Sequence, residues 1–287
     1  MTAVQEEPPL TVQGWGGGLL EVFRRRFLLS LLVRKELRVR YRASVLGLGW
    51  SYVKPAVQFF VYFIGMGIIL KQRAIGNYPV YLFGGLVVVN TFSEAVGNAA
   101  RSVVANADLV KKIWLPRELF PVASIFVAVV HLLPQVGVLL VGSLLTGWRP
   151  DPVGLAALVA GLLLVLLLAL GLGLLLGALN VAFRDVENVV DLVLMVLIWV
   201  SPVLYPWQRV AEVFGPGSPW LALYQANPLT VAVELVHRGT WATGSNAGAT
   251  PPGLMGQTLM AFGMTVVLIA IGQVVFRRLS GRFAQEL

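Results

Sequence analysis

Residues 34–55 read RKELRVRYRASVLGLGWSYVKP and join a basic block to a long apolar segment that starts near Val57. A helix with about 100° per residue places four cations of this block on one face, namely Arg34, Lys35, Arg38 and Arg42. A basic amphipathic helix of this kind suits the surface of a leaflet that carries anionic lipids. The stretch therefore predicts an interfacial helix that leads directly into a first membrane span.

The composition of the chain is that of an integral membrane protein. Of its 287 residues, 57% are hydrophobic and 13% charged, and the mean hydropathy is +0.79. The net charge of +8 does not indicate nucleic acid as a partner, because the cations lie at the ends of apolar runs, where anionic lipid and insertion topology require them. Cysteine is absent, which excludes disulfides, thiolate metal sites and a cysteine nucleophile.

Runs of roughly 20 apolar residues predict an all-α fold with six transmembrane helices. The candidate spans are approximately 53–70, 79–98, 119–146, 153–182, 189–206 and 257–276. The fifth contains Asp191 near its start and Pro202 near its end, where proline kinks or terminates a helix. Most lysines and arginines fall on one side of these spans, so the positive-inside rule places both termini in the cytoplasm.

This pattern of spans and charges divides the chain into three predicted parts. Residues 1–21 are polar and rich in Pro and Gly, which predicts a flexible cytoplasmic N-terminus. Residues 22–51 form the amphipathic interfacial helix, and residues 52–287 form the six-span domain with a cytoplasmic C-terminal tail. Between spans five and six, 207–256 contains two apolar pieces too short to cross a bilayer. They predict short re-entrant helices, with a surface loop carrying one amphipathic helix as the alternative.

Few residues offer catalytic chemistry. No phosphate-binding GxxxxGK[ST] loop is present, and the isolated His131 and His237 indicate hydrogen-bonded helix contacts more than metal ligands. Glycines in GLGLLLG (171–177) predict a close-packing helix face. Charges within spans, the usual sign of ion-coupled transport, are scarce beyond Glu94 and Asp191. We therefore expect no enzyme and no cofactor on this chain, and energy supplied by a partner subunit.

Aromatic side chains crowd the first span and the end of the fifth. Their flat apolar faces would line a conduit for sugar rings. The candidates are Tyr52, Phe59, Tyr62, Phe63, Trp199 and Tyr205. Phe59 and Phe63 share a helix face at i and i+4. Anchoring at the membrane interface or packing in the core remains the alternative for all of them.

Two cytoplasmic segments are candidates for docking a partner. In residues 105–118, Asn106 or Asp108 is positioned to cap a short charged helix that ends before Pro116. Residues 180–191 form a charged turn between spans four and five. An ordinary solvated loop is the alternative for both.

Four motifs together carry a resemblance to a known family. They are RYRASVLGLGWSYVKP (40–55), NADLVKKIWLPRELFPVA (106–123), FRDVENVVDLVLMVLIWVSPVLYP (183–206) and NPLT (227–230). In order and spacing they resemble the permease subunit of type-2 ATP-binding-cassette exporters, in the branch that exports O-antigen, teichoic acid and related polysaccharides. The resemblance covers roughly residues 25–285.

This resemblance implies a homodimer with a conduit at its interface and two copies of a nucleotide-binding ATPase subunit that hold ATP and Mg. The interfacial helix would be the family's gate helix, and the re-entrant helices its outer gate. Coupling to the ATPase would map onto six residues: Asn106, Asp108, Lys111, Lys112, Arg184 and Asp185.

The implied substrate is a polyprenyl-pyrophosphate-linked polysaccharide that crosses the bacterial inner membrane, with a galactan as one candidate. Its pyrophosphate would be attracted by four cations, Arg34, Arg38, Arg40 and Arg42. The alternatives are an exporter of a small drug or lipid with the same architecture, and an ion-coupled secondary carrier. An integral acyltransferase is less well supported, because no histidine with a nearby acid is evident within the spans.

Overall fold

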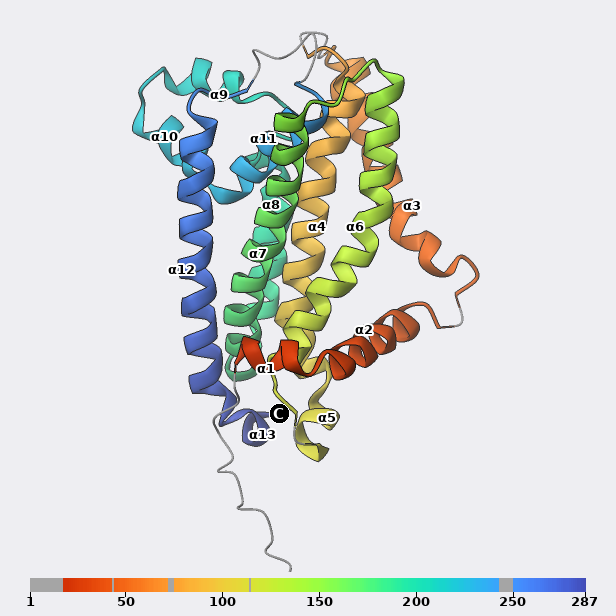
Figure 1. The fold of residues 1–287 in the computed structure, drawn as a ribbon, viewed down its shortest axis with the longest axis vertical. Helices are drawn as coiled ribbons and strands as arrows, with labels where there is room; N and C mark the ends of the chain where they lie inside the picture. Colours follow the sequence, from red (N-terminus) through yellow and green to blue (C-terminus); the bar gives the residue numbers. More distant parts are fainter. Residues whose placement is uncertain (1–17, 43, 72–74, 114, 243–249) are drawn as a thin grey trace, which may run out of the picture.

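The chain is helical throughout the part that the computed structural model describes, which comprises residues 18–42, 44–71, 75–113, 115–242 and 250–287 (Figure 1). No strand occurs among these residues. The predicted flexible N-terminus falls largely on residues 1–17 and so lies outside them. The elements are α1 (Leu19–Arg24), α2 (Arg26–Arg40), η1 (Gly47–Gly49), α3 (Trp50–Tyr62), the π-helical η2 (Phe63–Ile69), α4 (Tyr78–Ala105), α5 (Ala107–Lys112), α6 (Leu119–Leu145), α7 (Pro152–Ala182), α8 (Val186–Val200), α9 (Trp207–Phe214), α10 (Pro219–Ala226), α11 (Pro228–Thr240), α12 (Leu254–Ser280) and α13 (Phe283–Glu286).

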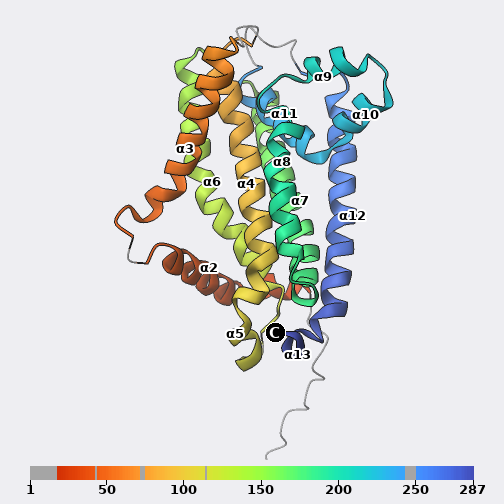
Figure 2. The same cartoon turned by 180° about the vertical axis from the view of Figure 1, so that it is seen from behind.

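Long helices stand side by side, with α7 packed against α4, α11 and α12 (Figures 1 and 2). Helix α2 lies across one end of this bundle and packs against α6, and α5 and α13 lie at the same end. Helices α9 and α10 lie at the opposite end. The bundle thus has one end built from α2, α5 and α13, where the predicted cytoplasmic elements are found.

Five helices are long and apolar enough to cross a membrane: Trp50–Ile69, α4, α6, α7 and α12. They confirm the all-α integral membrane class and overlap five of the six predicted spans. The remaining prediction, 189–206, overlaps α8, which has 15 residues and is therefore roughly 22 Å long. That length is short of the ~30 Å hydrocarbon core. Ser201 is extended because the following Pro202 disfavours the helical conformation, so the helix ends at Val200 and the count of six stays a prediction.

The glycine-rich face of α7 is a close-packing face, as its sequence predicted. A Cβ built at Gly173 would lie 2.6 Å from the Cβ of Ala99 on α4. One built at Gly171 would lie 3.0 Å from the backbone nitrogen of Ile269 on α12. The first distance is shorter than any that real Cβ atoms adopt and the second is unusually short, so these helices reach their spacing because the side chain is absent.

The described residues between α8 and α12 form three short helices, α9, α10 and α11, where two apolar pieces were expected. Pro228 divides the second piece, because Asn227 caps α11 by accepting a hydrogen bond from the Leu229 N–H at 3.0 Å. Most of α11 is buried against α4 and α7. This burial of α11 favours an inserted helix over a surface loop with one amphipathic helix, and the re-entrant arrangement stays a prediction.

Candidate functional site

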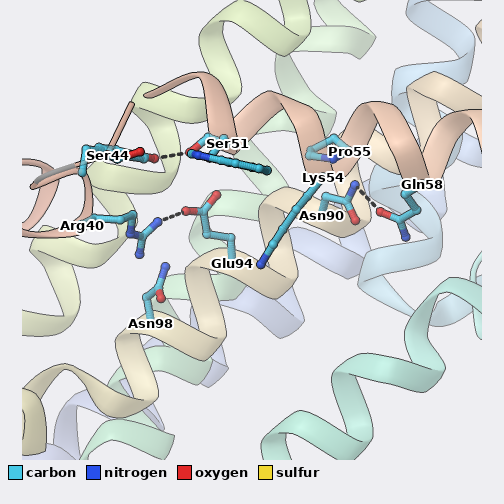
Figure 3. A pocket seen from close by; sticks show the side chains of 11 residues that line it. Arg40, Ser44, Ser51, Lys54, Pro55, Gln58, Asn90, Glu94 and Asn98 are labelled. Carbon is cyan, nitrogen blue, oxygen red and sulfur yellow. Dashed lines mark hydrogen bonds and ion pairs between the residues drawn. The ribbon is translucent and has the colours of Figure 1, made fainter. Parts of the chain in front are cut away.

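A cavity of about 700 Å³ opens where the end of α2, the start of α3 and the middle of α4 meet (Figure 3). Most of the residues that line it have a polar or charged group: Arg40, Tyr41, Ser44, Trp50, Ser51, Lys54, Pro55, Gln58, Asn90, Glu94 and Asn98. Most of these side chains come from two parts of the chain that are far apart in sequence. The cavity therefore exists only in the folded chain.

The local sequence explains how α2 and α3 surround this cavity. Helix α2 ends at Arg40, and α3 begins at Trp50 directly after the short helix η1. Gly47 adopts a left-handed φ of +51°, and its N–H donates to the Ser44 hydroxyl at 3.2 Å. Arg40 at the end of α2 and Lys54 in α3 line the same cavity although 14 positions separate them.

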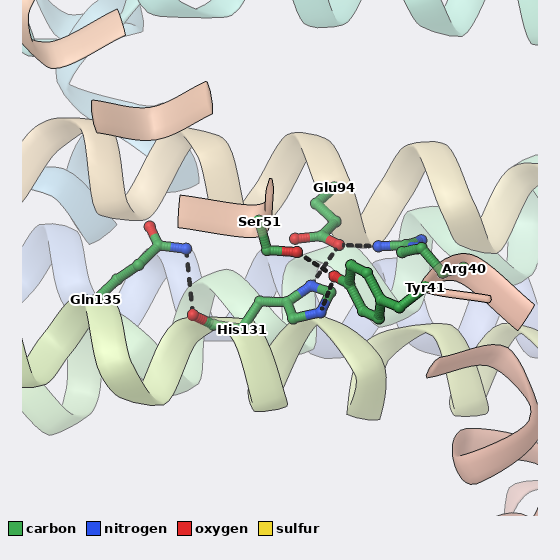
Figure 4. A network of polar contacts seen from close by, with 6 residues as sticks. All are labelled: Arg40, Tyr41, Ser51, Glu94, His131 and Gln135. Carbon is green, nitrogen blue, oxygen red and sulfur yellow. Dashed lines mark hydrogen bonds and ion pairs between the residues drawn. The ribbon is translucent and has the colours of Figure 1, made fainter. Parts of the chain in front are cut away.

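A polar network joins four helices at the wall of the cavity (Figure 4). Glu94 on α4 accepts from Arg40 and from His131 Nδ1, the latter at 2.7 Å. His131 Nε2 lies 2.8 Å from the Tyr41 hydroxyl, which also contacts the hydroxyl of Ser51. His131 is 1% exposed, and it is a hydrogen-bonded helix contact as its isolation in the sequence predicted.

The cavity holds two cations and one carboxylate. The Arg40 side chain is 34% exposed and the Glu94 side chain 26%. Lys54 lines the same space, and it forms no ion pair within the described part of the chain. Amide and hydroxyl groups complete the lining, including the Asn90 amide that donates to Gln58 at 3.0 Å. Such a mixture of cations and neutral donors can bind an anion with several oxygens.

Of the four predicted pyrophosphate-binding arginines, the structure places Arg40 in the cavity. Arg34 and Arg38 are exposed on α2, and Arg42 is exposed in the turn after it. Burial raises the pKa of Glu36 on the same helix above its ordinary value. Sequence reasoning did not single out Lys54, although it belongs to the motif 34–55 and stands one turn into α3.

The predicted aromatic residues lie in two groups. Phe59 and Phe63 stack with ring centroids 5.8 Å apart and 5° between planes, and Phe59 meets the edge of Phe83 at 5.6 Å. Tyr62 also packs against the core, and Tyr52 is half-buried. The second group is Trp199 and Tyr205: the Tyr205 hydroxyl donates to the backbone carbonyl of Trp199, and the Trp199 side chain is 53% exposed. Their role as conduit lining stays a prediction.

The predicted coupling segment forms the short helix α5, which confirms a helix ending before Pro116. Asp108, Lys111 and Lys112 are exposed, whereas Asn106 is buried. The Asn106 side chain does not cap α5. Its Oδ1 accepts from Lys35 Nζ on α2 at 2.5 Å, and its amide donates to the Ser102 carbonyl at 2.8 Å.

The second predicted docking segment is the exposed turn that contains Arg184 and Asp185, between α7 and α8. The start of α8 is tied to α4 by Arg101, which donates to Glu187 at 2.6 Å and to Asp191 at 2.6 Å. Helix α13 contacts both α5 and α7 at this end of the bundle. Asp191 is thus one partner of an ion-pair cluster.

Comparison with known proteins agrees with this architecture. Residues 28–240 match the ABC-2 type transporter family. An O-antigen export system permease protein of Klebsiella pneumoniae is 28% identical over 265 residues, which cover 91% of this chain and 95% of that protein. A protein of the same description from Myxococcus xanthus is 31% identical over 193 residues, covering 67% and 73%. With its several membrane-spanning helices, the chain is a multi-pass membrane protein that belongs to the ABC-2 type transporter family.

Proposed function

We propose that this chain is the permease subunit of an ATP-driven exporter that moves a polyprenyl-diphosphate-linked polysaccharide out of the cytoplasm. The observation that carries the proposal is the cavity with Arg40 and Lys54 at the junction of α2 and α3. The relatives' description as O-antigen export permeases supports the glycan class. The chain acts in the bacterial inner membrane with both termini in the cytoplasm, in keeping with the distribution of its basic residues.

The chemistry of the cavity suits the head of such a substrate. A diphosphate presents several charged oxygens, and Arg40 and Lys54 offer charge-assisted hydrogen bonds to them. Serine and asparagine side chains supply further neutral donors. The polyprenyl tail lies along α3, which has no buried residue and exposes Val57, Phe60 and Val61. The charged head and the apolar tail of the substrate thereby bind to neighbouring surfaces of the chain.

The functional unit is a homodimer whose interface forms the conduit. Helix α8 exposes a broad apolar face that includes Leu192, Val193 and Val196. Together with the chain after it, α8 is the fifth of the six spans in chain order, and this face packs against the second copy. Phe59, Phe63, Trp199 and Tyr205 offer aromatic surfaces for sugar rings, and the buried α11 forms part of the outer gate.

The energy comes from two nucleotide-binding subunits that dock at the end of the bundle where α5 lies. The exposed Asp108, Lys111 and Lys112 form one contact, and the turn with Arg184 and Asp185 forms the other. ATP and Mg are held by those subunits, so this chain is a permease without a cofactor of its own. Nucleotide-driven movement of α5 reaches α2 through Asn106 and Lys35.

Binding of a lipid diphosphate tests the proposal directly. The full-length chain in lipid nanodiscs is titrated with farnesyl diphosphate, with farnesol as the uncharged comparison. The double variant Arg40→Ala, Lys54→Ala is expected to weaken diphosphate binding by about tenfold or more, because charge-assisted hydrogen bonds contribute ~1.5–3 kcal/mol each.

The matched control removes two cations of the same region that lie outside the cavity, in Arg34→Ala, Arg38→Ala. It should retain affinity within about twofold, since exposed charges act weakly at a distance. Equal affinity of the wild type for farnesyl diphosphate and farnesol contradicts the diphosphate substrate and favours a small drug or lipid as cargo. Transport that proceeds without any ATPase partner indicates an ion-coupled carrier.

A further inference from the structure

The guanidinium of Arg40 already has an anion. Glu94 accepts a hydrogen bond from Arg40 Nη1, and the same oxygen of Glu94 accepts from His131 Nδ1 at 2.7 Å (Figure 4). The proposed substrate brings a second anion to this cavity. Since like charges at close range repel, Glu94 and a diphosphate compete for Arg40.

The competition depends on the charge of the incoming group. A phosphodiester lipid such as phosphatidylglycerol carries a single negative charge, like the carboxylate of Glu94, and gains little by replacing it. A diphosphate carries more charge and more oxygens, so it gains Arg40 and Lys54 together. Glu94 repels both anions, but the diphosphate offsets this repulsion through Arg40 and Lys54 together, whereas the phosphodiester has only one negative charge with which to do so. Specificity of this kind arises from a repulsive element set against the competitor.

We propose that Glu94 determines the specificity of the cavity: it occupies Arg40 against the singly charged lipids of the surrounding membrane and is displaced by the diphosphate. This proposal rests on the proposed function. His131 acts as a positioning residue, because it is buried and holds Glu94 from α6. When the diphosphate takes Arg40, Glu94 retains its hydrogen bond to His131, and the carboxylate is not left without a partner.

The same exchange has a mechanical consequence. The pair Arg40–Glu94 joins the last residue of α2 to the middle of α4. Its replacement by a bound diphosphate removes that connection, while Tyr41 still contacts His131 on α6. Arrival of the substrate therefore removes a contact between the end of α2 and α4.

The test uses full-length Glu94→Gln, which keeps the shape of the side chain and one acceptor oxygen for Arg40 and His131 but removes its charge. Farnesyl diphosphate is titrated in nanodiscs of phosphatidylcholine alone and in discs that also contain phosphatidylglycerol. In phosphatidylcholine we expect Glu94→Gln to bind about tenfold tighter than the wild type. With phosphatidylglycerol present, most of this advantage should disappear, because the singly charged lipid now competes for Arg40.

The matched control is Glu212→Gln, which removes a carboxylate from another arginine pair, Arg209–Glu212 at 3.3 Å on α9, remote from the cavity. It should follow the wild type in both kinds of disc. If Glu94→Gln binds farnesyl diphosphate like the wild type, or keeps its full advantage in the presence of phosphatidylglycerol, the proposal is wrong.

Two further results separate this proposal from the one on which it rests. If the wild type does not distinguish farnesyl diphosphate from farnesol, the proposed function fails first. If the wild type binds the diphosphate through Arg40 and Lys54 but Glu94→Gln changes nothing, only the role of Glu94 fails. Should Glu94→Gln unfold, Glu94→Asp replaces it: the shorter carboxylate withdraws from Arg40, so binding should tighten by roughly threefold, and unchanged binding overturns the proposal.

Discussion

Replacement of Gly272 by valine is expected to prevent the chain from accumulating as a folded protein. A Cβ at this position of α12 would lie 2.5 Å from the backbone carbonyl oxygen of Gly171 on α7, and 3.3 Å from the nitrogen of Leu175. Backbone cannot move aside like a side chain, so α7 and α12 must separate. Overpacking a core costs ~1–3 kcal/mol even where side chains yield, and a backbone collision costs more. Size-exclusion profiles and thermal unfolding of the detergent-solubilised chain measure the loss.

Gly263→Val provides the control for this prediction. Gly263 lies on the same helix, and nothing stands within 4 Å of a Cβ built there. The two variants share the change in helix propensity and differ in what the new side chain meets. A Gly272→Val protein as abundant and as heat-stable as Gly263→Val would contradict the close approach of α7 and α12.

Replacement of Lys35 by methionine is expected to separate ATP hydrolysis from export. Lys35 Nζ donates to Asn106 Oδ1 at 2.5 Å, and Asn106 immediately precedes α5. Methionine keeps the apolar stem but cannot donate a hydrogen bond, so movement of α5 no longer reaches α2. On the proposed function, export falls by about tenfold, equivalent to ~1.4 kcal/mol of coupling, while the reconstituted complex with its nucleotide-binding subunits still hydrolyses ATP.

Arg26→Met is the control, because it removes an exposed cation from the other end of α2. Asn106→Ala should reproduce the loss caused by Lys35→Met, and the double variant should be no worse than either, since both substitutions break one contact. Additive losses in the double variant, or normal export by Lys35→Met, would show that α5 and α2 are not coupled through this pair.

The membrane spans show which features of the fold a local sequence pattern can predict. Five of them could be predicted because length and hydropathy are properties of continuous segments. The segment 189–206 stays a predicted span, because the proline after Ser201 ends α8 at Val200 and leaves a helix of 15 residues. The end of α2 at Arg40 was missed. Residues 22–51 were predicted as one interfacial helix, whereas the structure has α1, α2 and η1 in this range and begins α3 at Trp50.

The cavity, in contrast to the spans, could not be predicted from a local sequence pattern. Arg40 belonged to the predicted basic block, but nothing in the sequence distinguished it from Arg34 or Arg38. What sets it apart is Glu94, 54 positions away on α4, and beyond that His131 on α6. Both had been noted in the sequence, one as a charge within a span and the other as an isolated histidine. Their partnership could not be predicted, because it depends on which faces of α4 and α6 meet.

Hydrophobic burial and charge distribution act on each segment separately, so the residue pattern alone was enough for the helical membrane class, most spans and the basic segment before the first of them. Helix α11 and the cavity depend instead on contacts between distant segments. The approach of α7 to α4 and α12 through their glycines, and the packing of α2 against α6, bring those segments together. Which cation faces which carboxylate was therefore decided by the packing of the helices, because side chains on different helices meet only after the helices have docked.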